Sequence, residues 1–259
     1  MDYTSSKYNI QLLQQYSLWV KTDYVYEHLM VVDGRQVVRY IRYAKDQPSE
    51  EGMKLLSLPF ERVSLLMPEQ NMLINPLELY DENKRGVYQK FLNHTSPENQ
   101  LLYTSTDFSL AISYVLDEWL LSDWKNIYAQ IDIIPEFAVV LETAKEVLSE
   151  GVALIVHELD KKTAFCLFNN KNLVFYNSFE VKNETDFRFY LLKVMELIKD
   201  LERFDQCIIS QQKSNMSFKD IVEDYSQKVR VISNPFWIEE EENNFSFIDK
   251  LNFKVEGEA

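Results

Sequence analysis

The residues best placed to do chemistry in this chain are acidic, and they lie in two similar turns. Asp23 lies in the turn Thr22-Asp23-Tyr24, and Glu158 and Asp160 lie in the turn formed by 158–162. In folds that grip a nucleotide with two copies of a hairpin unit, such turns hold the phosphates. They contain glycine, because only glycine lets backbone N–H groups come close to a phosphate. Neither turn contains a glycine here. Acidic residues in turns usually stabilise the turn and face water.

The other reactive residue types do not form a known motif. His28, His94 and His157 lack the spacing of a zinc site or a catalytic pair. Ser178 lacks the Gly-x-Ser-x-Gly elbow that exposes a nucleophile. The chain has only 5 glycines, no two of them close together, which excludes dinucleotide-binding and Walker loops. We therefore predict no catalytic residue, no metal site and no cofactor.

Charge and hydropathy exclude further classes of function. With 27 basic and 41 acidic residues, the net charge is −14, and such a chain repels the phosphate backbone of nucleic acids. No stretch approaches the roughly 18 to 20 apolar residues that cross a bilayer, and the first residues do not resemble a signal peptide. We expect a cytoplasmic protein without membrane insertion. Cys166 and Cys207 lie in apolar strand patterns and are expected to be buried thiols.

Two segments of the chain repeat one pattern of short strands. Residues 18–43 and 153–179 each indicate three strands joined by two tight turns, and Asp33-Gly34 is a strong hairpin signal. After the second copy, Asn183 can cap a helix whose apolar residues recur at three-and-four spacing up to Leu201. A strand, a short helix and a closing strand follow. This order of hairpins and crossovers predicts mixed sheets covered by helices.

The region between the two copies mixes both structure types. Residues 44–52 suggest a loop, and the pair Asn75-Pro76 suggests the start of a short helix toward Tyr80. Residues 117–126 suggest a helix. A strong amphipathic helix is predicted from Pro135 to Gly151.

These patterns divide the chain into four parts. We predict an N-terminal extension over 1–16, a first lobe with an inserted segment over 17–150, and a second lobe over 151–233. The tail, 234–259, alternates aromatic residues with acidic and amide residues. It is expected to pack on its own body or on a second copy, because so many aromatic residues are seldom left in water. A partner-binding arm is the alternative.

Two stretches resemble a known family. Residues 60–77 (FERVSLLMPEQNMLINPL) and 173–192 (LVFYNSFEVKNETDFRFYLL) are similar to an uncharacterised bacterial family, domain of unknown function 3822. The strand order, occurring twice, resembles the actin-like ATPase fold built from ribonuclease-H-like lobes. The resemblance covers about 15–233. The chain departs from the family pattern at Asn75, where valine is expected, and at Ser210, where glycine is expected.

The resemblance implies which parts an active member of this fold would need. A carboxylate on the first strand would orient magnesium or water, a role open to Asp23 and to Glu158 or Asp160. Glycine-bearing turns and an adenosine loop with paired glycines would hold the nucleotide, but the chain has Ser210-Gln211-Gln212-Lys213-Ser214 there. A ribonuclease-H-like nuclease would need converging carboxylates, with Asp23, Asp160 and Asp186 as candidates by elimination.

The sequence thus favours an α/β protein of two actin-like lobes without an evident active site. We expect a non-catalytic binding or scaffold protein that acts with a protein partner or as a homodimer. A divergent nucleotide-binding ATPase of the actin-like superfamily is the alternative.

Overall fold

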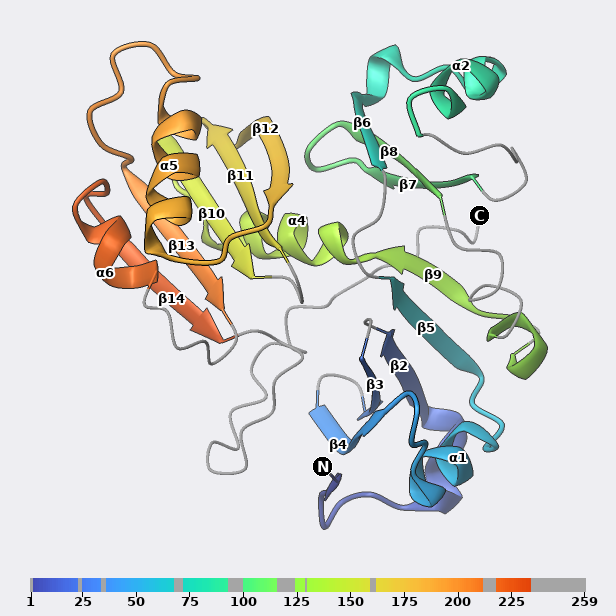
Figure 1. Ribbon diagram of the computed structural model, residues 1–259. Helices are drawn as coiled ribbons and strands as arrows, with labels where there is room; N and C mark the ends of the chain where they lie inside the picture. Colours follow the sequence, from blue (N-terminus) through green and yellow to red (C-terminus); the bar gives the residue numbers. More distant parts are fainter. Residues whose placement is uncertain are drawn as a thin grey trace. The chain divides into compact units, whose positions relative to one another are not determined.

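The computed structural model describes most of the chain, in two compact units. The described residues are 2–22, 25–33, 36–67, 72–92, 100–115, 124–128, 130–158, 162–211 and 218–233. Those up to Val139 form unit 1 and those from Val140 onward form unit 2, so the division falls within helix α4, Glu136–Val147. The two units are described separately (Figure 1).

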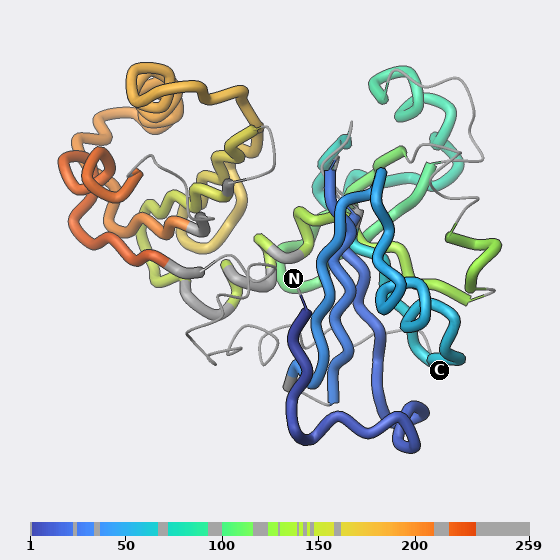
Figure 2. The backbone as a smooth tube through the Cα atoms, turned by 60° about the horizontal axis from the view of Figure 1, so that its bottom comes forward, coloured from blue at the N-terminus to red at the C-terminus, as the bar shows by residue number. Residues whose placement is uncertain are grey.

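Unit 1 is built on a six-stranded sheet with the order β1-β4-β3-β2-β5-β9. The strands β2, β3 and β4 form an antiparallel meander and run side by side in Figure 2, whereas β5 and β9 add in parallel to β2. Apolar residues fill both faces of the central strands, since Leu18 and Val20 are buried on one face and Trp19 and its partner Met30 on the other. The strands are Asp2–Thr4 (β1), Tyr16–Thr22 (β2), Tyr26–Asp33 (β3), Gln36–Ala44 (β4), Arg62–Met67 (β5) and Asp132–Pro135 (β9).

The N-terminal residues pair with the sheet through β1, at the edge formed by β4. A 3-10 helix over Ile10–Gln15 follows, capped by the side chain of Asn9. Tyr8 stacks on Tyr16, with ring centroids 5.9 Å apart, and the Arg39 guanidinium lies 5.4 Å from the centre of the Tyr8 ring. These contacts hold the N-terminal extension on unit 1.

A short helix, α1 (Glu50–Leu56), begins inside the segment expected to be a loop, 44–52, and takes up its last three residues. The expectation was wrong for 50–52 because only a few residues specify the start of the helix: Ser49 Oγ accepts a hydrogen bond from the Gly52 backbone, and two glutamates lie in the first turn. The absence of a side chain at Gly52 also matters. A Cβ there would collide with the ring of Tyr43 on β4, so glycine allows α1 to lie against the sheet.

The segment between β5 and β9 contains a second, three-stranded antiparallel sheet with the order β6-β8-β7. Pro76 is both the last residue of strand β6 and the N-cap of the short helix expected toward Tyr80, which is a single 3-10 turn, Leu77–Leu79. Proline is tolerated there because β6 is an edge strand. We call residues 72–115 the insert. Its remaining elements are β7 (Gln100–Ser105), β8 (Leu110–Val115), β6 (Met72–Pro76), a 3-10 turn (Glu82–Lys84) and α2 (Arg85–Gln89).

Unit 2 is a five-stranded mixed sheet with the order β12-β11-β10-β13-β14. Helices α5 and α6 cover one face, where Phe187, Leu191 and Phe218 pack on Leu154 and Phe165. Figure 1 shows α4 passing behind the sheet. The elements are β10 (Val152–Glu158), β11 (Thr163–Asn169), β12 (Asn172–Phe179), α5 (Glu184–Met195), β13 (Gln206–Gln211), α6 (Phe218–Glu223) and β14 (Val229–Ser233).

The expected mixed α/β architecture is confirmed, and both main sheets use the same arrangement of five strands. In each, the first three strands are antiparallel neighbours, and the fourth and fifth lie parallel on the other side of the first. The helix predicted over 117–126 falls largely outside the described residues, and so does the tail, 234–259. Among the described helices, none is long and apolar enough to span a membrane.

Candidate functional site

The C-terminal end of β2, just before the first turn of unit 1, holds a buried ion pair. Lys21 Nζ donates to Glu136 Oε1 at 2.7 Å, and each side chain is only 4% exposed. Glu136 is the first residue of α4, where the helix dipole favours a negative charge. The carboxylate of Glu136 is therefore bound to a cation of the protein itself.

The next residue of β2, Thr22, also forms a side-chain hydrogen bond within the protein. Thr22 Oγ1 donates to Glu27 Oε1 at 2.7 Å, and the two residues are cross-strand partners. Lys45 Nζ lies 3.4 Å from the same oxygen of Glu27. Glu27 is opposite Tyr43 on β4; burial, and next the charge of Glu27, raises the pKa of Tyr43 to about 12. This side of the sheet thus holds one carboxylate among a hydroxyl, an ammonium group and a phenol.

The other side of the same hairpin carries a buried histidine. His28 is the cross-strand partner of Lys21, and its Nδ1 lies 2.8 Å from the hydroxyl of Tyr40. Arg42 is opposite His28, and its guanidinium lies 5.0 Å from the centre of the Tyr26 ring. The arrangement is a set of separate polar pairs on the two faces of one sheet. We call Lys21, Thr22, Glu27, His28 and Glu136 the β2-end cluster.

The three acidic residues singled out in the sequence remain untested as site residues. Asp23 and Asp160 lie outside the described residues, and of Glu158 only the backbone is described, as the last residue of β10. The turns themselves lie where they were expected: β2 ends at Thr22 and β3 begins at Tyr26, while β10 ends at Glu158 and β11 begins at Thr163. Residues 23–25 and 159–162 contain no glycine.

Sequence reasoning missed the β2-end cluster. The signal in the sequence was a lysine and a threonine at the end of an otherwise apolar strand, YSLWVKT. Their partners could not be found, because Glu136 is 115 residues from Lys21. In unit 2, His157 is buried near the corresponding end of β10. Within the described parts of both units, no three His, Cys, Asp or Glu residues are grouped so that they could hold a metal ion.

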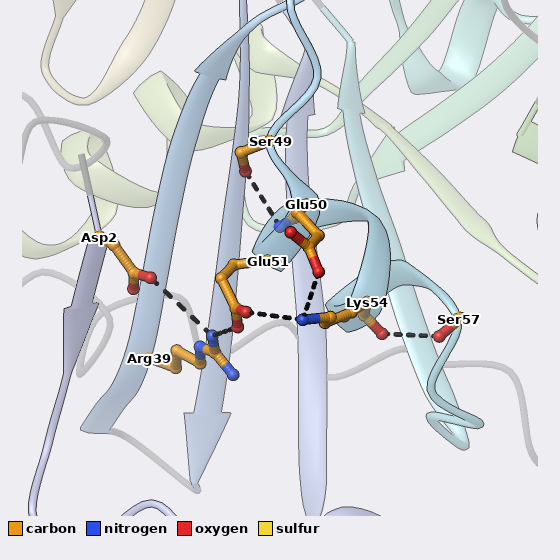
Figure 3. Close-up of polar contacts among 8 residues, drawn as sticks. Asp2, Arg39, Ser49, Glu50, Glu51, Lys54 and Ser57 are labelled. Carbon is orange, nitrogen blue, oxygen red and sulfur yellow. Dashed lines mark hydrogen bonds and ion pairs between the residues drawn. The ribbon is translucent and has the colours of Figure 1, made fainter.

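A second polar network lies on the surface of unit 1, between β1, β4 and α1 (Figure 3). Arg39 Nη2 lies 2.9 Å from Glu51 and 3.9 Å from Asp2, and Lys54 reaches both Glu50 and Glu51. The hydrogen bond from Lys54, followed by that from Arg39, lowers the pKa of Glu51. The network links the N-terminal strand and α1 to β4, and because its carboxylates are exposed, each ion pair contributes little to stability.

Comparison with known protein families identifies the family of this chain. The family model described as Protein of unknown function (DUF3822) matches residues 49–229. The chain belongs to this family. No curated protein sequence matches it. The resemblance noted from residues 60–77 and 173–192 is thereby confirmed.

Solved structures show the fold of this DUF3822 protein. A Bacteroides thetaiotaomicron protein with an actin-like ATPase fold and unknown function matches with a TM-score of 0.70 and 16% identity, over 89% of this chain and 95% of its own. The PilM–PilN type IV pilus biogenesis complex matches at 0.59 and 10%, over 91% and 97%. The cytoplasmic domain of EpsL, an inner membrane component of the Vibrio cholerae type II secretion system, matches at 0.51 and 11%, over 84% and 90%. The chain has the actin-like ATPase fold.

Proposed function

We propose that this protein is a non-catalytic member of the actin-like fold that serves as a binding or scaffold protein for another polypeptide. The observation that carries the proposal is the Lys21–Glu136 pair. Both side chains are buried and bonded to each other at 2.7 Å, directly before the first turn of unit 1. A nucleotide-binding site needs free carboxylates and backbone donors at that position.

Recruiting Glu136 to a metal would leave the Lys21 ammonium group buried without its partner. Breaking a buried ion pair in this way costs about 3 to 5 kcal/mol. A second buried carboxylate, that of Glu27, accepts a hydrogen bond from the hydroxyl of Thr22. The two turns that would wrap phosphates lack glycine, and their side chains would obstruct close approach of the backbone to a phosphate.

The fold neighbours support a role in assembly. One is a complex of PilM with PilN, and another is the cytoplasmic domain of a secretion-system component. An actin-like body can thus act through association with other proteins. We extend this to the present chain, as a cytoplasmic protein with a protein partner or a second copy of itself.

The shared strand order of the two sheets supports an origin by duplication of one lobe. In this account, the insert was added to the first copy between its fourth and fifth strands, β5 and β9. The lobe boundaries near residues 16, 150 and 233 follow from the same hypothesis. Limited proteolysis would test them, because exposed connections between independently packed lobes are cut first.

Nucleotide titration of the full chain tests the proposal against a divergent ATPase. Calorimetry and thermal shift with ATP or ADP and magnesium are expected to show no micromolar binding. Asp23→Ala and Asp160→Ala are the informative variants, and Asp46→Ala, an exposed aspartate in the turn after β4, is the matched control. Micromolar binding that survives Asp46→Ala but is lost with either of the other two substitutions would overturn the scaffold proposal.

The proposed scaffold role requires a protein partner or a second copy of the chain. Affinity purification of the full chain from its native cell after brief crosslinking, read by mass spectrometry, should recover one protein in stoichiometric amount, or show a homodimer by mass. A chain that stays monomeric and recovers no protein above the level of an unfolded control would count against a scaffold.

A further inference from the structure

Strand β12 lies at an edge of the sheet of unit 2 (Figure 1), and within the described residues no strand pairs with its outer side. It is the longest edge strand of the described part of the chain, and its eight residues, NLVFYNSF, include no charged residue and no proline. Charged residues, proline and very short strands are the usual protection of an edge, whose backbone groups otherwise pair with another strand. The one irregularity is a bulge opposite Leu167 and Phe168, and 175–179 keep a regular register with β11.

One hydrogen bond shows which backbone groups of β12 face outward. The N–H of Ser178 donates to Oδ1 of Asn177, its own neighbour in the chain, at 2.8 Å. Donation to this side chain indicates that the N–H lies on the side of the strand away from β11. Residues two apart direct their backbone groups to the same side, so Tyr176 and Ser178 both present N–H and C=O groups outward. Asn177 is exposed, so its side chain can move away and leave this N–H to another strand.

Aromatic rings lie along the same edge. Phe175, Asn177 and Phe179 share the face that α5 covers, and the two phenylalanines are only half-buried there. Tyr190 of α5 stacks on Phe179, with ring centroids 4.1 Å apart. Val174, in the bulge, is 49% exposed. A strand added beside β12 would remove more of this apolar surface from water, which favours the addition.

The distribution of charge favours a second copy of the chain as the added partner. The chain carries a net charge of −14, so two copies repel each other unless they meet at an uncharged surface such as β12. The ends of β12 differ in sign, since Lys171 precedes the strand and Glu180 and Glu184 follow it. Glu150 and Lys182 offset part of these charges. An antiparallel pair of β12 strands brings the basic end of one copy beside the acidic end of the other, whereas a parallel pair would bring like ends together.

We infer that the protein forms a two-fold symmetric dimer in which the β12 strands of two copies pair antiparallel and join their sheets into one. The regular stretch 175–179 sets the centre of the pair at Asn177. Phe175 of each copy then lies opposite Phe179 of the other, and cross-strand aromatic pairs stabilise a sheet. The two Asn177 side chains meet at the axis, where each amide can donate to the other and accept from it. The inference rests on the proposed function, because it names a second copy as the partner.

Sedimentation equilibrium of the full chain tests the dimer. We expect a mass of about twice 30.7 kDa at micromolar concentration. Asn177→Asp should raise the dissociation constant by about tenfold or more, because it sets two carboxylates against each other at the axis. Within one copy, the new carboxylate can still accept the Ser178 N–H. Added salt should lessen the effect, because it screens the repulsion.

Asn9→Asp is the matched control. Asn9 is an exposed asparagine of unit 1 that accepts the Gln11 N–H at 3.0 Å, so this variant makes the same change in net charge and in a similar hydrogen bond. It should leave the dissociation constant unchanged. Equal dimerisation of Asn177→Asp and Asn9→Asp would overturn the assignment of β12 as the interface.

Charge reversal tests the direction of the pairing. Lys171→Glu should weaken the dimer about threefold, since each exposed ion pair contributes little. Adding Glu180→Lys to this variant should restore the wild-type affinity, because the two ends again differ in sign. A double variant that is weaker still would contradict antiparallel pairing.

The inference and the proposed function fail in different ways. A wild-type chain that stays monomeric would overturn the dimer, and if it recovers another protein in stoichiometric amount, the scaffold role remains. Micromolar nucleotide binding that depends on Asp23 or Asp160 would overturn the scaffold role and leave the dimer standing, provided that Asn177→Asp still dissociates it.

Discussion

The main sheets of the two units have the same strand order, but the side chains buried against them differ in polarity. In unit 1, the C-terminal end of β2 contains the Lys21–Glu136 ion pair and the hydrogen bond between Thr22 and Glu27. In unit 2, the core beneath α5 and α6 is apolar, with Leu154, Phe165 and Phe187 among its members. Strand order follows from hairpins, crossovers and the alternation of apolar residues. The strand order does not determine whether an individual core position is polar or apolar.

The largest effect is expected in unit 1, for Glu136→Ala. The substitution leaves Lys21 charged and buried, so the free energy of unfolding should fall by about 4 kcal/mol. Urea denaturation followed by tryptophan fluorescence in a Trp237→Phe background is suitable, since the other three tryptophans of the chain all precede residue 140.

The double variant Lys21→Met with Glu136→Leu sharpens this test. Replacing both members of a buried ion pair by apolar residues is often close to neutral, so most of the loss should be restored. Lys54→Ala, which removes an exposed cation from the surface network, should change stability by less than about 1 kcal/mol. A double variant no more stable than Glu136→Ala would contradict the explanation that the loss comes from an unpaired buried charge.

A smaller loss is expected in unit 2, for Leu167→Ala. Leu167 is fully buried in the apolar core, and truncation should cost about 3 kcal/mol through lost burial and a cavity. Circular dichroism should record the loss. If the units unfold independently, the tryptophan signal of unit 1 should not change. A parallel shift of both signals would show that the two units unfold together.

An effect on the order of 2 kcal/mol is expected from Tyr43 at alkaline pH. Its pKa is raised from 10.0 to about 12 in the folded protein, so the folded state keeps its proton after the unfolded chain has lost it. Stability is therefore full below pH 10 and falls as the pH rises from 10 to 12. Tyr43→Phe should lessen this loss in urea titrations at pH 9 and pH 11.5. Equal losses in both proteins would contradict the assignment.

The smallest effects compare the helix caps of the two units. Ser49 caps α1 and Asn183 caps α5, each accepting a backbone hydrogen bond at 3.0 Å. Alanine at either position should cost about 1 kcal/mol in thermal or urea unfolding. Glycine substitutions are the matched controls, and they should cost only a few tenths of that energy. A much larger loss at Ser49 would mean that α1 holds β4 in place.

Local patterns predicted most of the elements, and the exceptions have physical causes. The strands of both meanders and the cap at Asn183 were evident, because alternation and capping act over a few residues. Helix α1 was missed, since one serine and two glutamates specify its start. The short helix expected after Pro76 is present as one 3-10 turn, Leu77–Leu79, but the sequence did not show that the same proline ends an edge strand, because that depends on the sheet and not on the dipeptide.

The candidate site shows the same division. That the turns after β2 and β10 lack glycine was readable directly from the sequence, and it is the basis for predicting no ordinary phosphate loop there. The sequence alone also determined the family resemblance, the mixed α/β class and the acidic charge. Only the tertiary structure revealed that Lys21 meets Glu136. Such contacts join residues far apart in the chain, and their energies depend on burial, which no local pattern specifies.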